Sequence, residues 1–252
     1  MKHSPHLGVT GIAAAIYCLS AVIPAQAASL IANGGFESGF SSWTRVDQLG
    51  SEGTFTIQSG TSSPVNGDPT PAPTEGSNAA MTDAFGSGSH VLYQDFEVGI
   101  LGAKLRFDIF IGNRAPQFNT PNPASLAFDL TSQTGENTLN QQARVDIVNI
   151  GADPFSVAAG DVLQNFYLTK VGDSLVSGYN SFEFDLSSLF AGKNGQTLRL
   201  RFAETDNILP FQVGVDNVSL NEITGIPPNG GGGNNAIPEP GSLPLFGLGL
   251  AV

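Results

Sequence analysis

The chain has 252 residues and a net charge of −12 at pH 7, with 10 Lys and Arg against 22 Asp and Glu. A protein this acidic repels phosphate backbones, so we expect no nucleic acid among its partners. The length suits one large domain with processing segments at its ends.

The first 27 residues have the pattern of a secretory signal peptide. Lys2 supplies a positive start, the segment from Leu7 to Ile23 is mostly apolar or small, and Ala25-Gln26-Ala27 forms a cleavage site. A membrane anchor is the alternative, but the apolar stretch is short and Pro24 follows it at once. Cleavage after Ala27 would remove Cys18, the only cysteine, which excludes disulfides and thiolate chemistry. We therefore expect export through the Sec machinery.

Short segments with a two-residue apolar period follow, separated by Gly, Pro, Asn and Ser. In Lys104–Ile111, for example, the apolar side chains share one face. Side chains alternate between the two faces of a strand, so each such segment has one dry and one wet side. The same pattern predicts strands at Thr54–Gln58, Val91–Val98, Ser125–Thr131, Arg144–Ile150, Leu163–Thr169, Asn180–Leu186, Thr197–Ala203 and Gln212–Leu220. The spacing predicts an all-β fold, an antiparallel β-sandwich of the jelly-roll type.

Other local signals complete this outline. In Thr197–Ala203 the alternation places Arg199 and Arg201 outward, and a single helical turn is predicted at Ser187–Ala191. Two proline-rich segments, Gly60–Gly76 and Arg114–Ala124, are predicted to be loops, because proline lacks the amide donor that a strand needs. Loops of this length either form a binding rim or are plain surface excursions.

The domain is predicted to span residues 28–223. Residues 224–236 form a linker that contains Gly230–Gly233, and residues 237–252 form a distinct tail. The tail begins with Pro238-Glu239-Pro240-Gly241 and continues with a Leu-rich stretch. Its physical alternative is a disordered apolar end. Twelve residues follow Pro240, fewer than the about 20 that a helix needs to cross a bilayer, so we expect the tail to be truncated or degenerate.

The Pro238-Glu239-Pro240 motif and the stretch after it resemble the PEP-CTERM sorting signal. This resemblance implies a protein of a Gram-negative bacterium that an exosortase processes after transient membrane association through the tail. It also implies a secreted or cell-surface location and an association with exopolysaccharide and biofilm matrix.

A second resemblance covers the domain itself. It begins with Asn33-Gly34-Gly35-Phe36-Glu37 and ends with Asp216-Asn217-Val218-Ser219-Leu220, a bracket similar to that of galactose-binding-like jelly rolls, including carbohydrate-binding modules. The resemblance implies that Glu37 and Asp216 bind a structural calcium ion where the first and last strands meet. Calcium takes carboxylate and carbonyl oxygens, which agrees with these residue types. In the alternative, both carboxylates bond local backbone amides. The apolar phase also slips at Asp216-Asn217, which predicts a β-bulge.

Aromatic and polar side chains are the candidates for sugar contacts. Aromatic rings stack on the apolar faces of sugars, so Trp43, Tyr93 and Phe110 are candidate platforms, with burial in the core as the alternative for each. Polar groups at strand ends could bind sugar hydroxyls or instead satisfy loop backbones. These candidates are Asn113, Arg114, Glu204 and Asp206.

Catalysis has little support in the sequence. After cleavage of the signal peptide His90 is the only histidine, and neither a nucleophile elbow nor a His-based zinc motif is present. We therefore expect a non-catalytic protein that binds exopolysaccharide or another glycan. The alternatives are a structural or adhesive matrix protein with a protein partner, which flat apolar strand edges would favour, and a glycan hydrolase, which needs a cleft with paired carboxylates.

Overall fold

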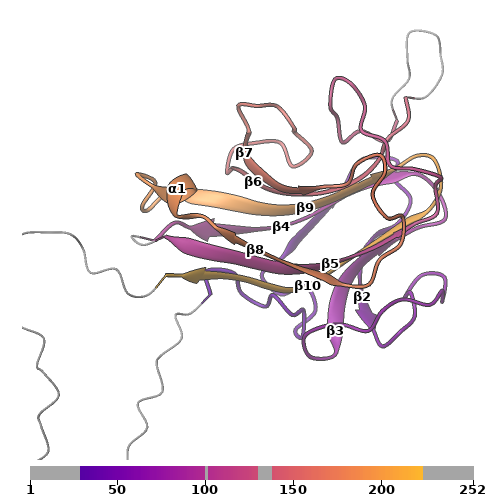
Figure 1. The fold of residues 1–252 in the computed structure, drawn as a ribbon, viewed down its shortest axis with the longest axis horizontal. Coiled ribbons are helices and arrows are strands. Elements are labelled where there is room, and N and C mark those ends of the chain that lie inside the picture. The colour runs from indigo at the N-terminus through magenta and orange to yellow at the C-terminus, as the bar shows by residue number, and fades with distance from the viewer. Residues whose placement is uncertain (1–28, 100–101, 130–137, 224–252) are drawn as a thin grey trace, which may run out of the picture.

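The computed structural model describes residues 29–99, 102–129 and 138–223, and in these residues two five-stranded antiparallel sheets pack into a sandwich (Figure 1). The β9 sheet has the order β1 (Thr44–Asp47), β4 (Gly88–Glu97), β9 (Thr197–Asp206), β6 (Gln141–Asn149) and β7 (Val162–Leu168). The β10 sheet has the order β2 (Thr54–Ser59), β3 (Asn78–Asp83), β10 (Phe211–Glu222), β5 (Ala103–Asn113) and β8 (Asn180–Asp185). The predicted fold class is confirmed. The predicted signal peptide, linker and tail lie outside the described residues.

The core lies between the two sheets and follows the predicted alternation. Leu105, Phe107, Ile109 and Ile111 of β5 are buried, and so are Leu198, Leu200 and Phe202 of β9. The rings of Phe107 and Phe202 meet edge to face across the core, with their centroids 5.6 Å apart. The period of two therefore identifies the inward residues correctly on β5 and β9.

The single helical turn is also where the sequence predicts it. Helix α1 covers Ser187–Phe190, and Gly192 follows with a φ of +74°. None of the helices in the described ranges has the length and apolar run that a membrane span requires.

The strand predicted at Ser125–Thr131 is wrong for its described residues, since 125–129 form an irregular segment. Its carbonyl groups are bound by side chains instead of by a neighbouring strand. The Asn140 side-chain amide donates to the carbonyls of Ser125 (3.0 Å) and Ala127 (2.8 Å), and the Thr205 hydroxyl donates to that of Leu126 (3.1 Å). With its polar groups satisfied in this way, the segment does not need a sheet partner.

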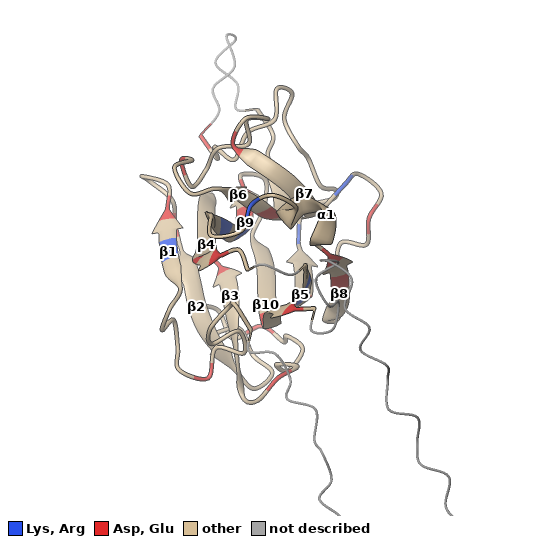
Figure 2. Ribbon diagram, turned by 90° about the vertical axis from the view of Figure 1, so that its left-hand side faces the viewer, with Lys and Arg blue, Asp and Glu red and all other residues tan. Residues whose placement is uncertain are grey.

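The outward residues of β9 are not in water, which corrects the prediction for Arg199 and Arg201. Arg201 is fully buried beneath residues 150–161 and donates to the carbonyls of Pro154 and Ser156, both at 2.7 Å. Its guanidinium also bonds the Asp146 carboxylate at 2.5 Å. Burial alone would raise the pKa of Asp146, but hydrogen bonds and positive charge from the neighbouring arginines lower it. Figure 2 marks the lysine and arginine positions of the ribbon in blue, and some of them lie beside the β9 label.

The two ends of the domain meet at one end of the sandwich. Ser29 forms an isolated antiparallel bridge with Asn221, near the end of β10. The predicted bulge is present: the register of β10 shifts between Asp216 and Ser219, and Asn217 has a φ of +51°. Gly34 packs so closely here that a Cβ atom would lie 1.7 Å from the Val218 carbonyl oxygen. Only glycine permits this approach.

Candidate functional site

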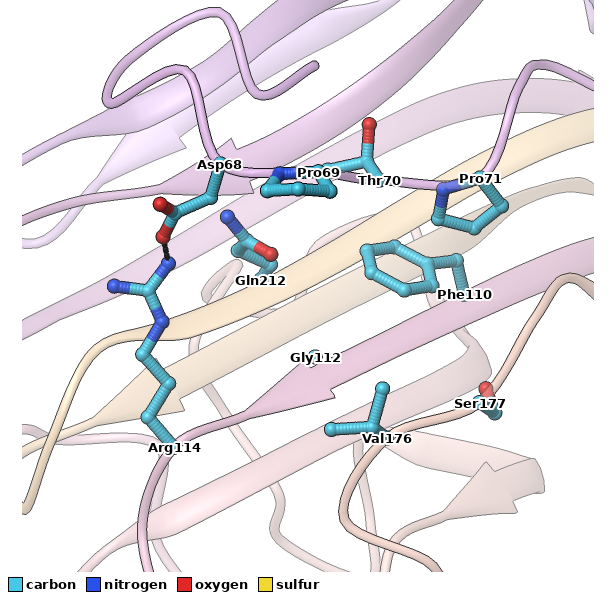
Figure 3. A pocket seen from close by; sticks show the side chains of 10 residues that line it. All are labelled: Asp68, Pro69, Thr70, Pro71, Phe110, Gly112, Arg114, Val176, Ser177 and Gln212. Atoms are coloured by element: carbon cyan, nitrogen blue, oxygen red, sulfur yellow. Dashed lines mark ion pairs between the residues drawn. The ribbon is translucent and has the colours of Figure 1, made fainter. Parts of the chain in front are cut away.

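A groove of about 370 Å³ lies on the outer face of the β10 sheet (Figure 3). Strands β5 and β10 form its floor, and the segments 68–71 and 176–177 form its walls. The lining residues are Asp68, Pro69, Thr70, Pro71, Phe110, Gly112, Arg114, Val176, Ser177 and Gln212. A cavity of this size is in the range of small-molecule and oligosaccharide sites.

Two glycines lie on the outward face of strands β5 and β10, close to the groove floor. Ile111 and Val213 point into the core, so their neighbours Gly112, Gln212 and Gly214 face outward. A Cβ atom at Gly112 would lie 2.9 Å from the Gln212 Oε1 atom, and one at Gly214 would lie 2.6 Å from the Tyr179 hydroxyl. Both glycines are therefore closely covered by neighbouring side chains, and a larger residue at either position would displace them.

The proline wall is held from below by a buried amide. The Gln58 Nε2 group donates to the Pro71 carbonyl at 2.7 Å and to the Thr70 hydroxyl at 3.0 Å. The Thr70 amide donates in turn to the Thr61 carbonyl at 3.0 Å. These bonds fix the pyrrolidine rings at the side of the groove, where they present apolar surface.

Several polar side chains also line the groove, beside its apolar surface. At one end Arg114 forms an ion pair with Asp68, and both side chains are partly exposed. Gln212 lies between this pair and Phe110, as Figure 3 shows. On the other wall, the Ser177 hydroxyl accepts a hydrogen bond from the Ile111 amide and donates one to the Gly178 carbonyl. The paired charges leave the groove without a strong charge of either sign.

Two of the predicted ligand-binding residues, Phe110 and Arg114, meet in this groove. Phe110 is 2% exposed and packs against Tyr179 with 5.9 Å between ring centroids, so it forms part of the floor and is not a projecting platform. The loop Gly60–Gly76, predicted to be either a rim or a plain excursion, supplies a wall. Gln212, Pro71 and Val176 were not predicted to take part.

The other aromatic candidates are structural. Trp43 is 7% exposed, its indole N–H donates to the Asn33 carbonyl at 3.0 Å, and its ring packs on Phe36 and Phe202. It is a core residue, the alternative weighed in the sequence analysis. The ring of Tyr93 is covered by the guanidinium of Arg199, 3.7 Å from its centroid. The Trp43 ring is buried, and Arg199 covers one face of the Tyr93 ring.

The polar candidates Asn113, Glu204 and Asp206 point between the sheets, away from the groove. The Asn113 Oδ1 atom accepts hydrogen bonds from the Ala115 amide and the Gln141 side chain, both at 2.9 Å. Burial raises the pKa of Glu204 well above its usual value and that of Asp206 to about 7. Asp206 lines a separate cavity of about 120 Å³ at the loop end of the sandwich. Glu204 is 1% exposed and cannot reach a polymer.

The predicted calcium ligands hold a loop against the sheet. Glu37 Oε1 accepts the Ser77 amide at 2.7 Å, and Asp216 Oδ2 accepts the amides of Thr74 (2.6 Å) and Glu75 (2.8 Å). These bonds agree with the alternative to calcium binding, in which both carboxylates bond backbone amides. Within the described ranges no three His, Cys, Asp or Glu side chains are grouped as a metal site. Calcium binding stays a prediction.

No protein-family model matches the chain, and no curated protein sequence matches it. Several solved structures are distantly similar. A family 61 carbohydrate-binding module in complex with β-1,4-galactotriose has a TM-score of 0.46 and 11% identity, covering 77% of this chain and 99% of that one. The K3 adhesin domain of Lys-gingipain from Porphyromonas gingivalis has a TM-score of 0.42 and 16% identity, covering 75% and 96%. The enzymatically active domain of tailspike protein 4 from bacteriophage CBA120 has a TM-score of 0.43 and 12% identity, covering 77% and 21%.

Proposed function

We propose that this domain binds a polysaccharide chain in the groove of the β10 sheet, without catalysis, as part of an exported matrix protein. The observation that carries the proposal is the groove itself. Its proline rings, Phe110 and Val176 offer apolar surface, while Gln212, Ser177 and Arg114 offer hydrogen-bonding groups beside it. Sugar rings have apolar C–H faces bordered by hydroxyl groups, and this combination is complementary to such a surface.

Charge supports a neutral ligand. The protein carries a net charge of −12, and the one arginine of the groove is already paired with Asp68. A polyanion would meet repulsion that these groups do not offset. The predicted signal peptide and sorting tail support export to the cell surface or medium, with exosortase and the Sec machinery as transient partners.

The absence of catalysis is part of the proposal. Burial raises the pKa of Glu204, Asp206 and Asp216, and none of these three residues lines the groove. A glycosidase needs two carboxyl groups beside the scissile bond. In the groove, the carboxyl group among the lining residues is that of Asp68, which is bound to Arg114.

A panel of immobilised polysaccharides, screened with and without calcium, tests the proposal. Cellulose, mixed-linked β-glucan and β-1,4-galactan are suitable members. Val176 is 67% exposed in the groove wall, so Val176→Tyr should fill the groove without unfolding the protein and should abolish binding. Val171 is 69% exposed and does not line the groove, so Val171→Tyr is the matched control and should bind normally. Equal binding by both variants would place the ligand elsewhere.

A protein partner is the second candidate function, favoured by exposed apolar side chains at the loop end. Leu49 is 98% exposed, Phe85 67% and Leu209 47%, and the last two line the same small cavity. Exposed apolar residues that gather in one place mark interaction surfaces. If the folded protein binds no polysaccharide of the panel, this candidate takes precedence.

A further inference from the structure

The hydrogen-bond partners of Gln212 determine which end of its side-chain amide faces the groove. Asp83 is 1% exposed and lies behind Gln212, with its Oδ2 atom 2.8 Å from Gln212 Nε2. The nitrogen of a side-chain amide is its donor, so the NH₂ group of Gln212 faces Asp83.

Ser63 supports this assignment from the other side. Its hydroxyl oxygen accepts the backbone amides of Val65 (3.1 Å) and Asn66 (3.3 Å), which leaves its hydrogen for a bond to Asp83 Oδ2. The Asp83 oxygen is thus the acceptor in both of its contacts. Gln212 cannot reverse its amide without placing two acceptors against each other.

The carbonyl end of Gln212 consequently faces the groove. Its Oε1 atom lies over Gly112, where a Cβ atom would come within 2.9 Å, and Figure 3 shows this oxygen on the side of Phe110. In the described residues no donor of the protein bonds Oε1. The groove therefore presents a fixed acceptor close to its apolar floor.

On the basis of the proposed function, we infer that Gln212 Oε1 selects polysaccharides with a free hydroxyl or N–H donor at this point. Asp83 is the positioning residue that fixes the orientation of the Gln212 amide and therefore this selection. Ethers, esters and carboxylates offer only acceptors there and are rejected, because the acceptor of a buried site would be left facing another acceptor. The groove thereby distinguishes unsubstituted neutral glycans from substituted or acidic ones.

The test compares binding of a polysaccharide from the panel before and after partial O-methylation, which converts hydroxyl donors into ethers. The unmutated protein should bind the methylated form at least about tenfold more weakly, the factor that one hydrogen bond of 1.4 kcal/mol supplies. Asp83→Leu removes the acceptor behind Gln212, so Gln212 can turn its NH₂ group to the groove. The discrimination ratio should then fall toward one. Asp173 is exposed and does not line the groove, so Asp173→Leu makes the same chemical change elsewhere and should keep the ratio.

Two further measurements keep the inference testable if Asp83→Leu does not fold. Gln212→Met keeps the side-chain volume but removes the acceptor, and should lose affinity for the unmethylated polysaccharide by a similar factor. In the unmutated protein without ligand, the Gln212 side-chain NH₂ signal in an NMR spectrum should exchange slowly with solvent, because it is bonded to buried Asp83.

The outcomes separate the inference from the proposed function. If polysaccharide binds but methylation has no effect, or if Gln212→Met binds as the unmutated protein does, the inference is wrong and the proposed function stands. Rapid exchange of the Gln212 amide also overturns the inference. If no polysaccharide binds to the folded protein, the proposed function fails and the selection of a glycan donor fails with it.

Discussion

The strands of both sheets show the same alternation of side chains, but loops cover the outer face of one sheet and leave a groove on that of the other. On the β9 sheet, residues 150–161 and 125–128 cover the outward side chains, and Arg201 is fully buried there. On the β10 sheet, two walls stand apart and leave a groove over Gly112. Alternation along a strand therefore predicts which side chains point away from the core. Whether those side chains reach water depends on the loops that cover the sheet.

Arginines show this difference directly. Arg201 is bound to Asp146 and to two backbone carbonyls, whereas Arg114 is paired with one exposed carboxylate at the groove rim. Arg201 on the covered face is thus held within the fold, whereas Arg114 at the open face stays partly exposed. The predictions below test this division, from the largest expected effect to the smallest.

Arg201→Ala should cause the largest loss of stability, about 3–5 kcal/mol in the free energy of unfolding, because it leaves Asp146 buried with one cation fewer. Urea denaturation measures the loss. Arg201→Lys keeps the charge but not the planar fork of donors, so its loss should be intermediate. A loss below 1 kcal/mol for the Ala variant would mean that the covered face opens readily to water.

Asp206→Asn should change the pH dependence of stability. Burial raises the pKa of Asp206 to about 7, so its protonated form is favoured in the folded protein. Stability from this group is fully present below its unfolded pKa near 4 and is lost as the pH rises to 7. The variant should equal the unmutated protein at pH 4 and exceed it at pH 8 by on the order of 3–4 kcal/mol. Melting curves at both pH values measure this, with exposed Glu97→Gln as the control.

Asp216→Asn should release the loop that crosses the open face. The carboxylate accepts hydrogen bonds from the backbone amides of Thr74 and Glu75. Replacing one of its oxygens by NH₂ would place this new donor against a backbone N–H donor. We expect a loss of about 1–3 kcal/mol in the free energy of unfolding. The loss should be the same in calcium and in chelator if loop anchoring is its cause. A melting temperature that rises with calcium only in the unmutated protein would support the predicted metal site.

Arg114→Ala should have the smallest effect on stability, less than about 1 kcal/mol, because its ion pair with Asp68 is partly exposed and screened by solvent. Its effect should appear in polysaccharide affinity, measured by titration calorimetry. A large loss of stability without a change in affinity would remove the distinction between the two faces.

Alternation predicted the inward residues of β5 and β9, and the phase slip at Asp216 predicted the bulge, because both are properties of one strand. Strand β3 was not predicted, since Asn78–Asp83 has small side chains and no clear alternation. The segment 125–129 was predicted as a strand because the sequence does not show that Asn140 and Thr205 bind its carbonyls.

The groove was only partly predictable. Phe110 and Arg114 were identified from their residue types, but their partners come from segments distant in the chain, 68–71, 176–177 and 212. The pairing of Gln212 with Asp83 joins residues 129 positions apart, and no local pattern signals it. An outward polar residue two positions before a glycine, Gly214, on strand β10 is a local signal that could have directed attention to Gln212.

The bridge between Ser29 and Asn221 has a practical consequence for engineering. Because the ends of the domain are neighbours, a short peptide could join them and new termini could be opened at an exposed turn. Gly172 is one such position, since its φ is +97° and no atom would contact a Cβ there. The domain could thus be circularly permuted, or inserted into a surface loop of another protein as a self-contained cassette.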